Sequence, residues 1–245
     1  MDATKVLIVG GGGAIAGQLI RQYQLWSQST GQPLELYVTS RQRPPAIHSG
    51  ITWLQVDFRN PESIAAAGEE LSKRATVLDH WVCCAGYLHG DFGLPEKALK
   101  SLQAAKLSGD FAVNSVGPLL MFQVCLGLLK RAPLAKAVFL SAQVGSIEDN
   151  RSGGWYGYRA AKAAQNQLLR CLSLEWSRRW PKATVTLLHP GTTDTDLSRP
   201  FQSFVPPEKL FSPERAGRQL VDLLLEQTPE QSGAFLAWDG QPIVW

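Results

Sequence analysis

KVLIVGGGGAIAG, at residues 5–17, is a short apolar run that ends in four consecutive glycines and then opens a helix-like segment. A strand, a tight glycine turn and a helix together present unpaired backbone N–H groups at the helix N-terminus, where a pyrophosphate binds. A P-loop is the alternative, but it needs Lys and Ser or Thr after its last glycine, and here Gln18 and Leu19 follow Gly17. The stretch therefore predicts the first unit of a dinucleotide-binding fold.

Beyond this turn, runs rich in β-branched residues alternate with longer segments of helical periodicity, which is typical of a parallel sheet with crossover helices. The predicted strands are 5–10, 34–40, 51–56, 76–84, 135–141, 183–189 and 234–237. The predicted helices are 15–29, 61–74, 99–105, 110–131, 156–179 and 213–227. Because no Ser/Gly linker or repeat divides the chain, we expect a single α/β domain over residues 1–245. Its predicted architecture is a Rossmann-type, doubly wound parallel sheet of about seven strands with helices on both faces.

Composition narrows the possible partners. The 245 residues carry 24 Lys and Arg against 21 Asp and Glu, without any long basic run, so nucleic acid is not an expected partner. The start of the chain lacks a signal-peptide pattern, and the most apolar window, 116–129, is shorter than the roughly 20 apolar residues of a membrane span. We therefore expect a cytoplasmic protein without a membrane partner. Cysteines and histidines lack CxxC or HExxH spacing, so we expect reduced thiols and no metal site.

The segment after the second predicted strand bears on cofactor choice. It reads Thr39-Ser40-Arg41-Gln42-Arg43 and contains no acidic residue. In a dinucleotide fold an acidic residue here holds the ribose 2′-OH of NAD, whereas an Arg accepts the 2′-phosphate of NADP. The sequence therefore favours NADP over NAD, with Arg41 as the phosphate ligand. A solvated surface arginine is the alternative interpretation.

Tyr158 and Lys162 stand four residues apart near the start of a predicted helix, so they share one face and are expected to meet. A cation beside a phenol favours the phenolate and lowers the phenol pKa. The spacing thus makes Tyr158 a candidate general acid and base near neutral pH, and the ammonium group can also hold ribose hydroxyls.

The order of these features resembles the short-chain dehydrogenase/reductase family over essentially the whole chain. The matching features are the glycine turn, CCAG at 83–86, Asn114, Ser141, Tyr158 with Lys162, and PGTTDT at 190–195. Within that family, VGSIEDN at 144–150, GGWYGYRAAKAA at 153–164 and the ending in Trp238-Asp239-Gly240 and Trp245 look like the branch called C-factor-like.

The resemblance implies roles for individual residues. Tyr158 would be the general acid, Lys162 would orient the nicotinamide ribose and lower the tyrosine pKa, and Asn114 would hold a helix kink and a proton-relay water. The implied cofactor-binding residues are Gly10, Gly13, Ile15, Arg41, Asp57, Phe58, Ala85, Gly86, Tyr158, Lys162, Pro190, Gly191, Thr193 and Thr195. Of these, Asp57 and Phe58 would flank the adenine, and Thr193 and Thr195 would hold the carboxamide and pyrophosphate. The alternatives are a backbone-satisfied Asn114 and an Asp57 that serves a helix-capping turn.

Three departures from the family pattern stand out. Ala14 and Ala16 replace two glycines, and their methyl groups should crowd the pyrophosphate or the helix packing. Cys83-Cys84 stands where the family has two asparagines. Counting back from Gly145, Ala142 occupies the position of the catalytic serine. A one-residue slip turns a strand side chain to the other face, but an irregular strand end can bring Ser141 in, so we favour Ser141 over Ser146.

These features predict an NADP-dependent oxidoreductase that interconverts a carbonyl compound and an alcohol by hydride transfer. The expected catalytic residues are Asn114, Ser141, Tyr158 and Lys162. The alternative is a dinucleotide-binding regulatory or signalling protein of the same fold with little turnover.

Two further segments bear on substrate and assembly. Residues 197–211 contain three prolines and no clean periodicity, so we expect a lid over a small-molecule substrate. Its apolar residues suggest a moderately apolar carbonyl compound, although they could also pack on the core; they are Phe201, Phe204, Val205 and Phe211. The helices at 110–131 and 156–179 carry apolar residues on more than one face, including Leu168, Leu169, Leu172 and Trp176. They predict a homo-oligomer, a homodimer or homotetramer.

Overall fold

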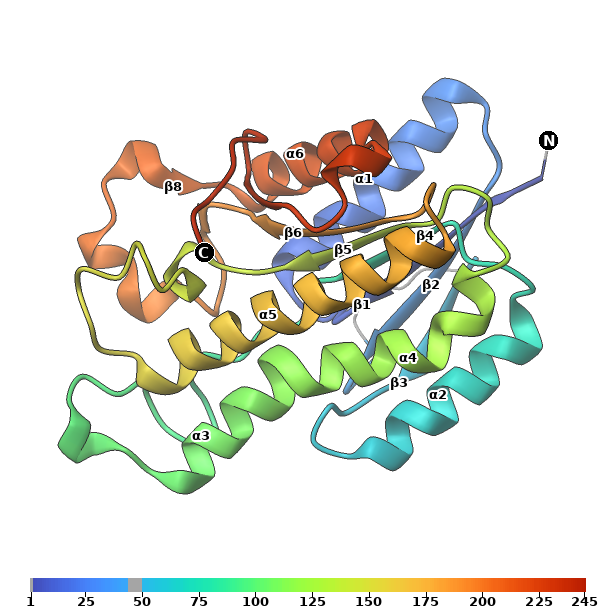
Figure 1. The fold of residues 1–245 in the computed structure, drawn as a ribbon. Helices are drawn as coiled ribbons and strands as arrows, with labels where there is room; N and C mark the ends of the chain where they lie inside the picture. Colours follow the sequence, from blue (N-terminus) through green and yellow to red (C-terminus); the bar gives the residue numbers. More distant parts are fainter. Residues whose placement is uncertain (1, 44–49) are drawn as a thin grey trace.

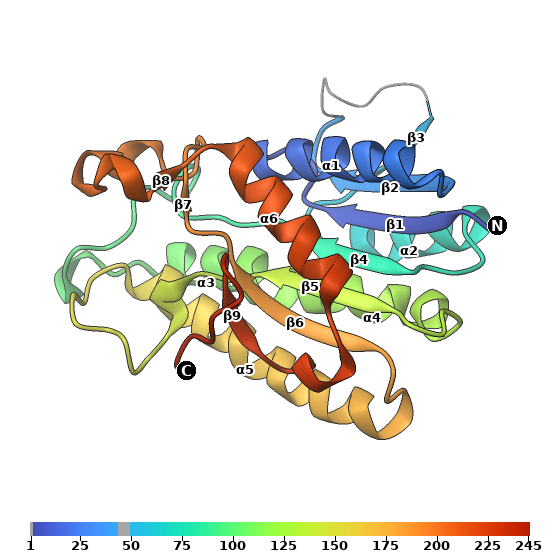
Figure 2. The same ribbon diagram turned by 90° about the horizontal axis from the view of Figure 1, so that it is seen from above.

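A seven-stranded parallel sheet forms the centre of the computed structural model, which describes residues 2–43 and 50–245 (Figure 1). Figure 2 shows the strand order β3-β2-β1-β4-β5-β6-β9, so the order reverses between β1 and β4. The strands are β1 (Thr4–Val9), β2 (Leu34–Ser40), β3 (Ile51–Gln55), β4 (His80–Cys83), β5 (Lys136–Leu140), β6 (Thr184–His189) and β9 (Phe235–Ala237). The doubly wound Rossmann-type sheet is therefore confirmed. The strand predicted at 76–84 is shorter, because the chain becomes extended in the sheet only from His80.

Helices cover both faces of the sheet, because successive residues of each strand point to opposite sides. In β1, Val6 and Ile8 face a core formed with α1 (Ala14–Thr30) and α6 (Pro213–Glu226). Leu7 and Val9 face a second core. That core is formed with α2 (Pro61–Arg74), α4 (Gly117–Leu129) and α5 (Tyr156–Arg179). In Figure 1 the first pair of helices lies above the sheet and the other three lie below it.

One helical stretch replaces the two helices predicted at 99–105 and 110–131. Leu99–Ser101 form only a 3-10 turn, η1, and the chain is then helical through α3 (Ala104–Phe111), η2 (Ala112–Val116) and α4. η2 is a π turn, in which the N–H of Gly117 bonds to the carbonyl of Ala112. The stretch Ala104–Leu129 is long and apolar enough to cross a membrane, unlike the shorter window seen in the sequence. Half of its apolar window is buried, and core helices meet the same criterion.

The segment 197–211 has more regular structure than predicted. It forms two 3-10 turns, η4 (Arg199–Phe204) and η5 (Pro207–Lys209), followed by β8 (Leu210–Phe211). β8 pairs in parallel with β7 (Thr192–Thr193), which follows β6 closely. The prediction that this segment is neither helix nor strand was therefore wrong in part, because 3-10 segments of six and three residues and a strand of two are too short to leave a periodic pattern.

Candidate active site

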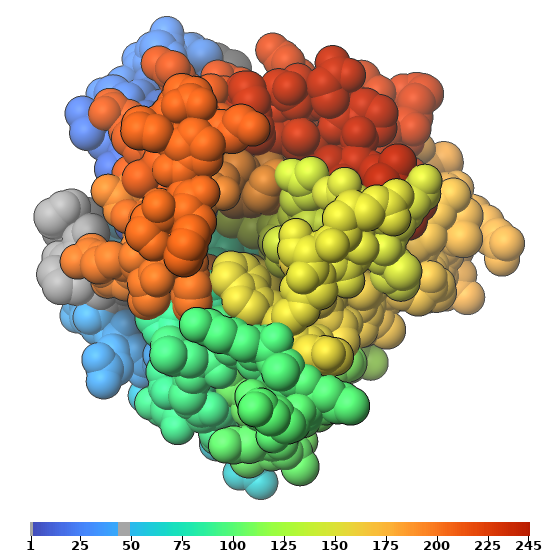
Figure 3. Space-filling view, turned by 90° about the vertical axis from the view of Figure 1, so that its left-hand side faces the viewer, coloured from blue at the N-terminus to red at the C-terminus, as the bar shows by residue number. Residues whose placement is uncertain are grey.

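A cavity of about 930 Å³ opens where β1, β2, β3 and β4 end. The carboxyl ends of parallel strands, next to a reversal of strand order, are where open α/β sheets bind ligands. Figure 3 views the molecule from this end, where green, yellow and orange segments surround a hollow. The predicted cofactor residues that line the cavity are Gly10, Gly13, Ile15, Arg41, Asp57, Phe58, Ala85, Gly86 and Thr195. The others stand outside its lining: Tyr158, Lys162, Pro190, Gly191 and Thr193.

The glycine turn leaves room for a ligand at the start of α1. Gly10 has a left-handed φ of 83°, and a Cβ there would lie 2.6 Å from the backbone nitrogen of Ala85. Only glycine fits such a position. Gly13 precedes α1 without a side-chain cap, and no acidic residue occupies the first turn. The open N–H groups and the positive end of the helix dipole therefore suit an anion.

The two alanines of the turn have different surroundings. Ala16 is fully buried, and its methyl group belongs to the core between α1 and the sheet rather than to the cavity surface. Ala14 is exposed at the cavity, where crowding of a pyrophosphate stays a prediction.

Arg41 follows β2 at the cavity rim, and its side chain is exposed. Its carbonyl accepts a hydrogen bond of 3.1 Å from Gln55 Nε2, which fixes the backbone beside β3. Its guanidinium makes no hydrogen bond or ion pair with any other residue that the structure describes. The position thus offers a cation at the end of the second strand.

The carboxylate of Asp57 is already held by a residue that the sequence analysis missed, Arg59. Arg59 Nη2 lies 2.9 Å from Asp57 Oδ2, and Arg59 Nη1 lies 3.1 Å from Asp91 Oδ2. Hydrogen bonds from Arg59 are the main reason that the pKa of Asp57 is lowered. Asn60, rather than Asp57, caps α2.

A Cβ at Gly117 would collide with Phe58, so Phe58 is packed on the start of α4.

Asn114 ties the π turn to the segment that follows β4. Its Nδ2 donates to the carbonyls of Tyr87 (2.8 Å) and Asp110 (3.0 Å), and its Oδ1 accepts from the Tyr87 N–H (2.9 Å). Its amide is thus satisfied by backbone groups at a break in the helix. The proton-relay water stays a prediction.

Tyr158 and Lys162 are buried on the same face of α5, and no hydrogen bond joins their side chains. Lys162 Nζ donates to the Leu140 carbonyl (2.8 Å) and to Gln165 Oε1 (3.1 Å), and not to the Tyr158 hydroxyl. Burial lowers the pKa of Lys162 to about 8. Burial, followed by the charge of Asp110, raises the pKa of Tyr158 well above its usual value. Both causes act in the same direction, so the expected lowering of the phenol pKa by Lys162 is not found in this structure.

Both candidate serines have protein partners. Ser141 Oγ donates to Asn166 Oδ1 at 2.6 Å, whereas Ser146 Oγ donates to the carbonyl of Trp245 at 3.2 Å. Neither serine lines the cavity, and Ala142 stands between them half-buried. Their contacts therefore do not support the expectation that Ser141 faces the substrate.

The segment after β6 is shaped by packing. Gly191 has a φ of 76° and lies against the rings of Phe211 and Trp238, which stack edge to face at 4.8 Å. Thr193 is buried, and its hydroxyl donates to the Gly191 carbonyl. Only Thr195 of this segment's predicted ligands reaches the cavity.

An aromatic wall, formed by Trp155, Phe201 and His89, lies beside Tyr158. The Trp155 ring is 4.9 Å from that of Phe201 and 6.3 Å from that of Tyr158, and the His89 ring lies 5.8 Å from that of Phe201. These three residues come from separate loops, so no spacing in the sequence marks them as neighbours.

Comparisons with known proteins show the family to which the chain belongs. The family model described as short chain dehydrogenase matches residues 5–205. A 1-hydroxy-2-glutathionyl-2-methyl-3-butene dehydrogenase from Rhodococcus sp. (strain AD45) is 33% identical over 78% of each chain. The C-signal of Myxococcus xanthus is 32% identical over 60% of this chain and 84% of its own. A carbonyl reductase from chicken fatty liver, solved with NADPH bound, covers 100% of both chains at a TM-score of 0.83 and 23% identity. The chain therefore belongs to the short-chain dehydrogenase/reductase family of oxidoreductases.

Proposed function

We propose that the protein is an NADPH-dependent carbonyl reductase that also works in reverse as an alcohol dehydrogenase. The observation that carries the proposal is the buried Tyr158 and Lys162 pair on α5, which packs against the η2 turn that contributes Val113 to the cavity. A buried phenol and a buried amine behind a cavity of cofactor size are suited to proton transfer shielded from water.

The cavity residues fit a dinucleotide. The open N–H groups at the start of α1 suit a pyrophosphate. Gly10 lies close to the backbone of Ala85, and because glycine has no side chain, a pyrophosphate can approach the backbone of the turn there. Arg41 suits a 2′-phosphate at the end of β2. A solved structural neighbour carries NADPH, which accords with this choice.

The residues of the chain then divide the proton chemistry among themselves. A bound nicotinamide supplies the hydride. Tyr158 donates its proton to the carbonyl oxygen of the substrate, since its raised pKa keeps the phenol protonated at neutral pH. Lys162, charged below about pH 8, stabilises the phenolate that remains and holds the ribose hydroxyls. Ser141 and Ser146 are given no step, because other protein groups hold their hydroxyls.

The aromatic wall favours an apolar carbonyl substrate. The Trp155 ring packs edge to face against the rings of Tyr158 and Phe201, and Phe201 belongs to the proposed lid. The other apolar lid residues are placed differently: Phe211 packs against Trp238 and Arg215, and Phe204 is 90% exposed. We therefore assign the substrate preference to Phe201 rather than to the whole lid.

An NADPH oxidation assay with a panel of aldehydes, ketones and quinones tests this function. We expect turnover with at least one apolar aldehyde or ketone. The likeness to the C-signal and the occupied serines favour the second candidate, a dinucleotide-binding signalling protein with little turnover. Measurable NADPH binding without turnover of any compound would support that second candidate instead.

Arg41→Ala is expected to weaken NADPH binding by about tenfold or more while leaving NADH binding nearly unchanged. The 2′-phosphate is close to a dianion at neutral pH, and a charge-assisted hydrogen bond from an Arg is worth roughly 1.5–3 kcal/mol. Arg43→Ala should have a smaller effect, because Pro44 follows it and restricts its backbone. Residues 44–49, which include Pro44 and Pro45, lie outside the described residues. Titration of each variant with both cofactors decides the matter, and equal losses for NADPH and NADH would remove Arg41 as the phosphate ligand.

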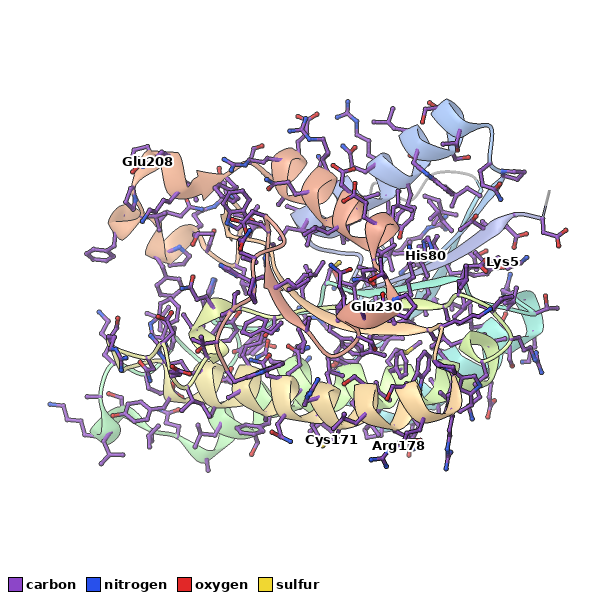
Figure 4. The ribbon with its side chains drawn as sticks, turned by 45° about the horizontal axis from the view of Figure 1, so that its top comes forward. Lys5, His80, Cys171, Arg178, Glu208 and Glu230 are labelled. Atoms are coloured by element: carbon purple, nitrogen blue, oxygen red, sulfur yellow. The ribbon has the colours of Figure 1, made fainter. Side chains whose placement is uncertain are left out.

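We also propose that the protein is a homo-oligomer built on α4 and α5, most simply a dimer. The core already covers Leu169 and Trp176 and partly covers Leu172, so these residues no longer argue for assembly. Leu174 on α5 and Val116 before α4 remain 46% exposed. Figure 4 shows Cys171 and Arg178 on the outer side of α5, the side available to a second copy. Light scattering at micromolar concentration should report a dimer or tetramer, and a monomer would contradict the proposal.

A further inference from the structure

The helix that carries Tyr158 begins without a cap of its own. Its N-cap residue is Trp155, whose side chain makes no capping hydrogen bond, and no acidic residue occupies the first turn. Trp155 also has a left-handed backbone, with φ 50° and ψ 44°, and is the one non-glycine residue with positive φ in the described chain. A tryptophan in this conformation persists only when its surroundings hold it, and such strained positions cluster at functional sites.

Glu96 supplies what the helix lacks. Glu96 lies in the loop between β4 and α3, 61 residues before Gly157 of α5, and its side chain is 3% exposed. Its side-chain Oε2 accepts a hydrogen bond of 3.2 Å from the N–H of Gly157, and its own carbonyl accepts one of 2.5 Å from Trp155. Gly157 is the second residue of α5, whose N–H an N-cap side chain normally serves. Glu96 therefore holds the backbone on both sides of Tyr156, the first residue of α5.

The surroundings of Gly157 keep this arrangement tight. A Cβ at Gly157 would collide with Asp110 Oδ2 and lie 3.1 Å from Glu96 Oε1. Both carboxyl groups therefore lie against Gly157, and only glycine leaves room for them. Lys106 Nζ lies 2.6 Å from Asp110 and balances its charge, and both side chains are almost fully buried. Tyr158 follows Gly157 directly, so any shift at this contact moves the phenol.

We propose that Glu96 is a positioning residue for Tyr158, which it holds by anchoring the N-terminus of α5 through Gly157 and Trp155. The inference rests on the proposed function, in which Tyr158 is the general acid. It also links the loop that brings His89 and Asp91 to the cavity with the helix that brings the phenol, and Figure 1 shows the chain before α3 beside the start of α5.

Two substitutions separate the reach of this side chain from its charge. Glu96→Gln keeps the length, and its amide oxygen can still accept from Gly157. Glu96→Asp keeps the charge but is one methylene too short. We expect Glu96→Asp to lower kcat by about tenfold with the KM for NADPH within about twofold of wild type, and Glu96→Gln to stay within about threefold of wild-type kcat. Glu96→Ala should resemble Glu96→Asp where it folds.

Hydrogen exchange gives a readout that does not depend on turnover. The peptide with the start of α5 should exchange about tenfold faster in Glu96→Asp, and at close to the wild-type rate in Glu96→Gln. Ser212→Ala is the matched control, because Ser212 Oγ caps α6 by accepting from the Arg215 N–H. It should speed exchange at the start of α6 and leave kcat unchanged.

The outcomes are distinct from those of the proposed function. Loss of activity in Tyr158→Phe together with wild-type kcat and exchange in Glu96→Asp would overturn the role of Glu96 and leave the function standing. Equal losses in Glu96→Gln and Glu96→Asp would mean that charge and reach are both needed, which also overturns a role by hydrogen-bond positioning. Activity retained in Tyr158→Phe would instead remove the proposed function, and the exchange rates would still decide whether Glu96 anchors the helix.

Discussion

Tyr158→Phe is expected to lower kcat for carbonyl reduction by at least about a hundredfold while NADPH binding stays within about twofold of wild type. The change removes the hydroxyl that donates the proton and keeps the ring that packs beside Trp155. The phenol hydroxyl makes no hydrogen bond to another residue in the described chain, so its loss leaves no buried partner unpaired. Steady-state kinetics of NADPH oxidation and a separate cofactor titration measure the two quantities.

Tyr156→Phe is the matched control for this prediction. Tyr156 lies two residues earlier on the same helix and is 41% exposed. The Tyr156→Phe variant loses a phenol hydroxyl, as Tyr158→Phe does, but outside the proposed site. The kcat of this variant should therefore remain within about twofold of wild type. Activity of Tyr158→Phe as high as that of Tyr156→Phe would place the general acid elsewhere.

The fold could be predicted from the sequence because its signals are local. Successive apolar residues of β1 are buried in the cores on opposite faces of the sheet, as Val6 and Leu7 are. Asn60 and Ser212 cap the helices that follow them with their own side chains, so the helix starts can be recognised in the sequence. The prediction was wrong at 99–105, where η1 is only a 3-10 turn. It also broke the helical stretch from Ala104 to Leu129 at residues 106–109, which lie inside α3. The π turn at Ala112–Val116 falls within the helix predicted at 110–131 and leaves no gap in the apolar pattern.

The candidate site could be predicted only as far as residue type and order decide it. Gly10 and Arg41 follow their strands directly, so counting along the chain places them at the cavity. The partners of Lys162 and Ser141 could not be counted, because Leu140 and Asn166 reach them through packing between β5 and α5. Burial then decides the sign of the Tyr158 pKa shift, and a spacing of four residues carries no information on burial.

Lys162→Met is expected to lower kcat/KM for carbonyl reduction by at least about a hundredfold at pH 7 and to change its pH dependence. Burial lowers the pKa of Lys162 to about 8, so its amine is charged below that pH and neutral above it. If the charge stabilises the phenolate left on Tyr158, wild-type kcat/KM must fall as the pH rises through about 8. The methionine variant has no amine to titrate, so its residual activity should show no inflection there.

Lys136→Met removes a comparable group far from the chemistry and serves as the control. Lys136 stands at the start of β5, whereas the cavity opens at the carboxyl ends of the strands. Like Lys162, it donates from its amine to a backbone carbonyl, that of Leu225, and burial lowers its pKa. This variant should keep kcat/KM within about twofold and retain the fall near pH 8. An unchanged inflection in Lys162→Met would assign the titration to another group, and full activity at pH 7 would remove the buried charge of Lys162 from the mechanism. The comparison thus separates a lysine needed for proton transfer from one that only satisfies the carbonyl of Leu140.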